Sequence, residues 1–313
     1  MKKVGLWFYE NDNGISIKKK LVERLENKEY EVYCYFDMRD CYVKNGKVYS
    51  REGYCLSDLD ILYHMNADEQ NSYQNDILKL IELSGVHVFN NYDAFMKCKD
   101  KLITNMILRQ HGLPVPNSML INNHVDKEVV NDFFIESGGV VIKPRSNHGG
   151  KGIIKVETLE QFWDIYTATA NIFDNYYIEQ YIEFEKNDYR VEIFDGEVVG
   201  GYSRIKNGSY KTNVSSGGRI TGIPVTEEAK KIALKASKVL GVTTTIVDMI
   251  KSKKDNKLYI LEVNPIMGIF VEAVEKSEFK GPVNYNIPEQ CKNDELKLNK
   301  IIKYIDNFFI TNK

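Results

Sequence analysis

The sequence predicts an α/β protein with a small open α/β domain at the N-terminus, followed by two α+β lobes. Two observations carry this prediction. Short β-rich runs alternate with amphipathic helical patterns through the first hundred residues, which is typical of a β-α-β arrangement. A helical pattern that starts at Asp100 then stops at Gly112, ahead of two prolines that cannot continue it, so a new unit begins in this region.

The first unit is predicted to be an open sheet that ends near residue 96. No Gly-x-Gly-x-x-Gly follows its first β-rich run, so the phosphate fingerprint of dinucleotide binding is missing. The elements expected here lie at 4–9, 17–25, 30–36, 60–63, 77–83 and 86–90.

The rest of the chain is predicted to form two lobes, 97–182 and 183–313. A polar turn at 251–257 joins two β-rich runs, 244–250 and 258–264, which predicts a β-hairpin. The last helix carries an apolar stripe that indicates core packing. The other expected elements are strands at 140–143 and 176–182, a β-rich block at 188–204, and helices at 159–170, 227–240 and 296–309.

Composition excludes several classes of protein. Forty-two Lys and Arg against forty-four Asp and Glu leave a net charge of -2, which disfavours nucleic acid as a partner. Five cysteines without Cys-x-x-Cys spacing imply neither a disulfide scaffold nor a structural zinc site. The first apolar run ends at Glu10, too soon for a signal peptide or a membrane span. We therefore expect a cytoplasmic protein without a membrane partner, and the composition leaves a homo-oligomer open.

The predicted hairpin carries the most informative polar residues. Because strand side chains alternate, Asp248 on one strand and Glu262 and Asn264 on the other fall on the same face if the turn is centred near residue 254 or 255. Two carboxylates this close repel when buried, unless a cation lies between them. Oxygen ligands of this kind suit Mg²⁺ or Mn²⁺. A hairpin whose polar face simply meets water is the alternative.

A glycine-rich loop follows the strand that ends at Lys143. Gly149, Gly150 and Gly152 would let backbone N–H groups approach an anion, because no Cβ obstructs them. The loop would then act as a movable lid over phosphate. Plain turns also contain such glycines, and Lys101 and Lys143, each taken alone, would be read as surface lysines.

A third group of polar residues lies on or beside the β-rich segments before the hairpin. Asp188, Arg190, Arg204 and Asn213 belong to it. Arginine's planar fork suits carboxylate and phosphate oxygens, so Arg190 and Arg204 could offset charge on a transferred phosphoryl group. Solvated arginines on the surface are the alternative.

Taken in order, these residues resemble the ATP-grasp superfamily, and within it the RimK-like carboxylate-amine ligases. That group includes ribosomal-protein glutamate ligase, LysX-type enzymes and the glutathione synthetases. The resemblance covers roughly residues 97 to 272. Its motifs are Asp100-Lys101, Gly112-Leu113-Pro114-Val115-Pro116, Val141-Ile142-Lys143-Pro144, Ile178-Glu179-Gln180-Tyr181-Ile182, Asp188-Tyr189-Arg190, Asn213 before Gly217-Gly218, Val247-Asp248 and Leu261-Glu262-Val263-Asn264-Pro265.

The resemblance implies an ATP-grasp fold whose two lobes sandwich ATP, and it implies a role for each motif. Lys101 and Lys143 would hold phosphates, covered by the loop of Gly149, Gly150 and Gly152. The backbone of Glu179, Gln180, Tyr181 and Ile182 would bind adenine, with Asp188 near the ribose. Two magnesium ions, or manganese, would be held by Asp248, Glu262 and Asn264. The γ-phosphoryl group and the activated carboxylate would face Arg190, Arg204 and Asn213.

The reaction that the resemblance implies is ATP-dependent ligation of a carboxylate to an amine. The carboxylate is first phosphorylated, and the amine then displaces phosphate from the acylphosphate to give an amide. Small-molecule carboxylates and amines, amino acids among them, are the expected substrates, with a peptide or a carrier protein also open as acceptor. Two alternatives remain: ligation to a carrier-protein thiol, and an ATP-binding module of the same fold without turnover.

Overall fold

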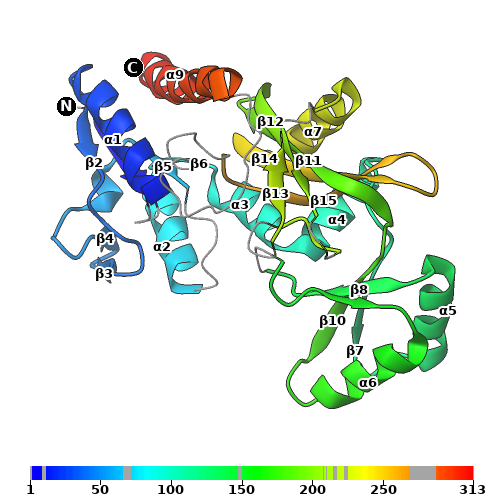
Figure 1. The fold of residues 1–313 in the computed structure, drawn as a ribbon. Coiled ribbons are helices and arrows are strands. Elements are labelled where there is room, and N and C mark those ends of the chain that lie inside the picture. Colours follow the sequence, from blue (N-terminus) through cyan, green and yellow to red (C-terminus); the bar gives the residue numbers. More distant parts are fainter. Residues whose placement is uncertain are drawn as a thin grey trace.

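The computed structural model describes residues 2–8, 12–65, 72–146, 150–206, 208, 210–213, 217–221, 225–267 and 287–312. These residues form three sheets and one separate hairpin. Figure 1 shows the N-terminal unit at one side, the C-terminal sheet in the middle and a lobe with α5 and α6 below it. None of the described helices is both long and apolar enough to cross a membrane.

The N-terminal sheet is parallel, as the alternating pattern predicts. Its strands are β1 (Lys3–Trp7), β2 (Glu31–Tyr33), β5 (Ile61–His64) and β6 (His87–Phe89), in the order β2-β1-β5-β6. Helices α1 (Asp12–Glu26) and α2 (Ser72–Leu83) connect them. Parallel neighbours need such crossovers, which explains the β-α-β sequence pattern.

A short hairpin inserted in this unit was not predicted. Strands β3 (Tyr42–Lys44) and β4 (Lys47–Tyr49) pair through Asn45-Gly46, and both turn residues have positive φ. This dipeptide favours two-residue hairpin turns because both positions tolerate the left-handed conformation. A short 3-10 helix, η1 (Leu56–Asp58), follows it.

The second sheet is antiparallel and has helices on one face. The strands β7 (Ser118–Asn122), β8 (Val140–Lys143), β9 (Ile154–Val156) and β10 (Asn175–Gln180) run in the order β7-β10-β8-β9. Helices α5 (Lys127–Ser137) and α6 (Leu159–Thr169) bury residues such as Ile142 and Ile178 against that face. Alternate residues, including Lys143, therefore face the other way. Helices α3 (Tyr92–Lys99) and α4 (Lys101–Gln110) precede this sheet.

The third sheet is antiparallel and contains the predicted hairpin. It consists of β11 (Phe184–Phe194), β12 (Glu197–Ile205), β13 (Arg219–Thr221), β14 (Thr244–Ser252) and β15 (Leu258–Asn264), in the order β13-β12-β11-β14-β15. Helix α7 (Glu227–Leu240) packs on one face, where Val191 and Val247 contribute to the core. The opposite face carries polar residues such as Arg190 and Asp248 between buried apolar ones such as Ile246 and Ile250.

The last helix is longer than predicted. Helix α9 (Ile287–Thr311) begins nine positions before the expected start at 296. Its predicted apolar stripe is buried, with Ile301 and Ile305 in the core of the N-terminal unit. Lys297 is fully buried too, and its Nζ lies 2.8 Å from the carboxylate of Glu192 on β11. The pattern missed this lysine because a buried lysine is rare without an acidic partner from another element.

One of the three sheets lies within each of the ranges 1–96, 97–182 and 183–313 that the sequence analysis proposes as units. The boundaries at residues 96 and 182 stay predictions.

A buried histidine in the N-terminal sheet leads to a prediction about pH. Burial lowers the pKa of His64 from 6.5 to about 4, against the opposing effect of its bond to the Asn90 carbonyl. Between these two pH values the unfolded chain binds a proton that the folded protein does not bind. The free energy of unfolding therefore falls as the pH drops below 6.5, by up to about 1.4 kcal/mol per pH unit.

His64→Gln removes this titrating group. In urea unfolding at pH 7 and pH 5, we expect the loss of unfolding free energy on acidification to be about 2 kcal/mol smaller in His64→Gln than in the wild type. His124→Gln, a change at an exposed histidine, should keep the wild-type loss. Equal losses in all three proteins would contradict the prediction.

Candidate active site

The third sheet brings most of the predicted site residues together on the face away from α7. Arg190 on β11 pairs with Asp248 on β14, and Asp248 pairs with Glu262 on β15. Ile246 pairs with Asn264 in the same ladder. The predicted hairpin register is confirmed, so Asp248, Glu262 and Asn264 share one face near the end of the hairpin.

Asp248 lies at the centre of a buried cluster of charges. The side chain of Arg190 places its Nε 2.8 Å from one oxygen of Asp248, and the Nη2 of Arg204 lies 3.2 Å from the other. Only 5% of Asp248 is exposed. Burial raises the pKa of Asp248 to about 6, against the opposing effect of the two arginines, and the neighbouring Asp188 and Glu262 raise it further. A cation near this carboxylate would favour its ionised form.

Asp188 is more enclosed than the sequence suggested. It is 1% exposed, and its carboxylate forms an ion pair with Arg204 and accepts a hydrogen bond of 3.0 Å from the Arg204 backbone N–H. The hydroxyl of Thr212 donates to it as well, at 2.6 Å. These interactions fix the Arg204 side chain against Asp188. Contact of Asp188 with a ribose stays a prediction.

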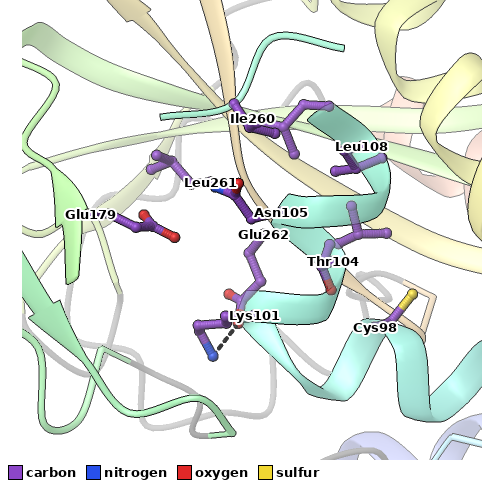
Figure 2. Close-up of a pocket in the computed structure, with 11 residues that line it drawn as sticks. Cys98, Lys101, Thr104, Asn105, Leu108, Glu179, Ile260, Leu261 and Glu262 are labelled. Carbon is purple, nitrogen blue, oxygen red and sulfur yellow. Dashed lines mark ion pairs between the residues drawn. The ribbon is translucent and has the colours of Figure 1, made fainter. Parts of the chain in front are cut away.

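Lys101 and Glu262 form an ion pair across two elements. Lys101 opens helix α4, and its Nζ lies 3.0 Å from a carboxylate oxygen of Glu262 (Figure 2). Asp100 caps the same helix by accepting hydrogen bonds from two backbone N–H groups, and Arg145 pairs with Asp100. This capping fixes the start of the helix, and with it the position of Lys101.

Lys143 and Glu179 form a second, more deeply buried pair. They come from neighbouring strands β8 and β10, on the sheet face opposite α5 and α6. The hydroxyl of Tyr177 donates to Glu179 at 2.6 Å. Figure 2 shows the Glu179 carboxylate turned toward the space beside Lys101 and Glu262. Lys101, Glu179 and Glu262 all line the small pocket drawn there.

A larger cleft lies between the two antiparallel lobes, beside the segment that connects them. Its volume is about 990 Å³. The connecting residues Gln180, Tyr181 and Ile182 line it, with Lys155 from β9 and Tyr259 from β15. The ammonium of Lys155 lies 4.5 Å from the centre of the Tyr181 ring. The resemblance implies that the backbone of these connecting residues binds adenine, and this role stays a prediction.

Gly150, in the described part of the glycine loop, is held by a segment of the other lobe. Gly149 lies outside the described residues, whereas Gly150 and Gly152 both have positive φ. Lys211 donates to the Gly150 carbonyl at 2.7 Å. Asn213 packs so closely on Gly150 that a Cβ there would lie 2.6 Å from its Oδ1.

Sequence reasoning singled out Asn213 but missed the residues before it. Lys211 and Thr212 contact the glycine loop and Asp188 respectively, and Tyr210 donates to the Ile153 carbonyl at 2.8 Å. Their position next to Asn213 in the sequence is the one feature that could have indicated these residues.

The polar residues of the hairpin fit a magnesium ion. No group of three His, Cys, Asp or Glu side chains is placed to hold a metal in the described part of the chain. The candidate set is instead two carboxylates and one carboxamide, at neighbouring positions of two strands. The Nδ2 of Asn264 is buried and has no hydrogen-bond partner among the residues described, so no bond through that nitrogen fixes the carboxamide, whose Oδ1 would be the atom that binds a metal. Oxygen donors of this kind suit Mg²⁺.

Two antiparallel lobes face each other across a cleft. One carries the buried lysine and the glycine loop, and the other carries the acidic hairpin. This arrangement is typical of an ATP-grasp protein. The chain belongs to the family of the RimK-like ATP-grasp domain, whose model matches residues 98–278. The family expected from the sequence is thereby confirmed.

Individual relatives agree with this assignment. The probable alpha-L-glutamate ligase of Shewanella halifaxensis is 26% identical over 265 residues, which cover 83% of this chain and 57% of that protein. The tetrahydromethanopterin:alpha-L-glutamate ligase of Methanocaldococcus jannaschii is 31% identical over 215 residues, or 67% of this chain and 72% of the relative. The chain thus spans little more than half the length of the Shewanella relative.

A solved structure shows the same fold. The ATP-grasp ligase PsnB, complexed with a phosphomimetic variant of a minimal precursor, Mg and ADP, matches with a TM-score of 0.64 and 18% identity. The match covers 96% of this chain and 99% of PsnB. The fold therefore extends over the N-terminal unit, beyond the residues that the family model matches.

Proposed function

We propose that this protein is an ATP-dependent ligase that joins a carboxylate to an amine. The observation that carries the proposal is the paired arrangement of Asp248, Glu262 and Asn264 on one face, with Arg190 and Arg204 beside them. A module that only binds nucleotide has less need of a buried and a half-buried arginine next to carboxylates that could hold a metal ion. The family membership and the glutamate ligase relatives support the same activity.

In this proposal each lobe binds one part of ATP. Lys143 and Lys101 bind phosphates, while the loop of Gly149, Gly150 and Gly152 covers them. The backbone of residues 179–182 binds adenine in the interlobe cleft, since these residues line it or adjoin it. Asp188 holds Arg204 and lies near the ribose. Magnesium, in one or two ions, or manganese in its place, would be held by Asp248, Glu262 and Asn264, and would offset charge on the phosphates.

The chemistry begins with a substrate carboxylate, which is a poor electrophile. Its oxygen attacks the γ-phosphorus of ATP, the bond to the β-phosphate oxygen breaks, and ADP leaves with that electron pair. Arg190, Arg204 and Asn213 face the transferred phosphoryl group and offset its charge. The amine then attacks the acyl carbon, phosphate leaves and a proton is released, which gives the amide. Closure of the glycine loop keeps water from the acylphosphate.

The substrates are proposed by class. The names of the relatives favour an amino acid, glutamate first, as one reactant. PsnB is named as a complex with a precursor, so a peptide is a reasonable acceptor to test beside small amines and carboxylates.

A screen for stimulated ADP release tests the proposal. Purified protein with ATP and Mg²⁺ is offered amino acids and other carboxylates, each with and without amines and model peptides, and products are read by mass spectrometry. We expect one pair to raise ADP release at least about tenfold and to give a product that is lighter by one water than its two substrates. ATP binding without any stimulated release would favour the silent module, and a thioester product would favour the carrier-protein alternative.

A further inference from the structure

At the end of β15, side chains rather than backbone N–H groups donate hydrogen bonds to the carbonyls of Asn264 and Pro265. Asn264 is the last residue of β15, and Pro265 follows it. Proline has no N–H group, so it cannot extend the ladder with β14. The Asn264 carbonyl accepts a hydrogen bond of 2.7 Å from the Thr245 hydroxyl, and the Pro265 carbonyl accepts one of 3.0 Å from Nδ2 of Asn90.

Asn90 is committed to this junction with its whole side chain. It is 1% exposed and follows β6 of the N-terminal sheet. Its Oδ1 accepts from the backbone N–H groups of Thr243 and Thr244, at 2.6 and 2.8 Å. Its Nδ2 also donates to the Thr244 carbonyl at 2.7 Å. The amide therefore links the start of β14 to the end of β15 and connects both to the N-terminal sheet.

These hydrogen bonds fix the backbone at Asn264 and Pro265, whereas the side-chain nitrogen of Asn264 forms no bond with the described residues. The Thr245 side chain holds the Asn264 carbonyl, and the Asn90 side chain holds the Pro265 carbonyl. By contrast, Nδ2 of Asn264 has no partner in the described part of the chain. The backbone thus sets where the carboxamide starts, and no bond through Nδ2 to the described residues keeps its Oδ1, the atom that could bind a metal, from turning to a ligand. Metal ligands need such support, because affinity depends on where the donor atom lies before the metal arrives.

We infer that Thr245 and Asn90 are positioning residues for Asn264 as a metal ligand. The inference rests on the proposed function, since it concerns the ion that accompanies the nucleotide. It goes beyond that function by assigning roles to two residues outside the motifs of the resemblance, neither of which would touch ion or substrate.

The main variant is Thr245→Val, which keeps the shape of the side chain and removes the hydroxyl donor. The readout is Mn²⁺ affinity in the presence of ADP, measured by electron paramagnetic resonance, so it does not depend on turnover. We expect about a tenfold loss of Mn²⁺ affinity, in the range known for residues that support a ligand. Thr245→Ser keeps the donor and should bind Mn²⁺ like the wild type.

Asn90→Asp provides a second, independent variant. It puts a carboxylate oxygen where Nδ2 now faces the carbonyls of Thr244 and Pro265, so the junction should be pushed apart. We expect a larger loss, about 100-fold, in Mn²⁺ affinity. ADP affinity without metal should stay within about threefold of the wild type in both variants, because the lysines and the cleft are untouched.

A matched control separates positioning from general destabilisation. Thr169 is a half-buried threonine in the lobe of α5 and α6, whose hydroxyl bonds the Ile165 carbonyl at 2.7 Å and Tyr176 at 2.8 Å. Thr169→Val should lose some stability but no Mn²⁺ affinity. Wild-type Mn²⁺ affinity in Thr245→Val and Asn90→Asp overturns the inference, as does an equal loss in Thr169→Val or in Thr245→Ser. If the wild type itself binds no Mn²⁺ with ADP, the proposed metal site fails instead.

Discussion

Glu262→Gln is expected to lower metal-dependent ADP formation about 10³-fold in a protein that stays folded. The change keeps the shape of the side chain and removes one of the two carboxylate charges on the hairpin face. Charge stabilisation of several kcal/mol by a bound metal corresponds to a rate factor of this order. The measurement is ADP release at saturating ATP over a range of Mg²⁺ concentrations, with circular dichroism to verify the fold.

Asp248→Asn tests the same site with a second consequence. It removes the carboxylate charge that lies 2.8 Å from Arg190 and 3.2 Å from Arg204. Both guanidinium groups, one buried and one half-buried, then lose a partner, so stability should fall as well. Glu262→Gln takes a partner from Lys101 but leaves both arginines paired with Asp248, so the smaller loss of stability is expected for Glu262→Gln. Glu197→Gln serves as control, because Glu197 at the start of β12 is a largely exposed carboxylate whose ion pair is with Lys300, and it lines neither pocket. Full turnover in both Glu262→Gln and Asp248→Asn would reject the hairpin as the metal site.

The hairpin could be predicted from sequence because its geometry is local. The polar turn and the alternation with period two fix which residues of 244–250 and 258–264 share a face. The observed ladder contains one irregularity, between Asp248 and Met249, that the pattern did not reveal. It does not disturb the prediction, since Asp248 still pairs with Glu262 and Asn264 lies on the same side of the irregularity.

The partners of the predicted residues could not be obtained in this way. Lys101 and Glu262 lie 161 positions apart, and nothing in the pattern of either element indicates their ion pair. Asn90 and Pro265 are similarly distant, and their bond depends on how the N-terminal sheet docks onto the hairpin. Short-range periodicity reports burial and facing, whereas these contacts depend on the packing of complete units.

Lys143→Met is expected to have two large effects that a double variant can separate. Lys143 and Glu179 form a deeply buried ion pair, so loss of the lysine leaves a carboxylate without a counter-charge. We expect a fall of 3–5 kcal/mol, as an order of magnitude, in the free energy of unfolding. If Lys143 also binds phosphate, ATP affinity should fall roughly 10- to 100-fold, as for loss of one charged hydrogen bond.

The double variant Lys143→Met/Glu179→Gln removes the charge that the single change exposes. Glutamine can still accept the hydrogen bond from Tyr177, so most of the unfolding free energy should return. ATP affinity, measured by calorimetry, should stay low because the phosphate partner is still missing. Glu179→Gln alone keeps Lys143 and the adenine-binding backbone, and should bind ATP within about threefold of the wild type. If the double variant recovers both stability and ATP affinity, Lys143 is only the structural partner of Glu179, and the phosphate contact must come from another cation.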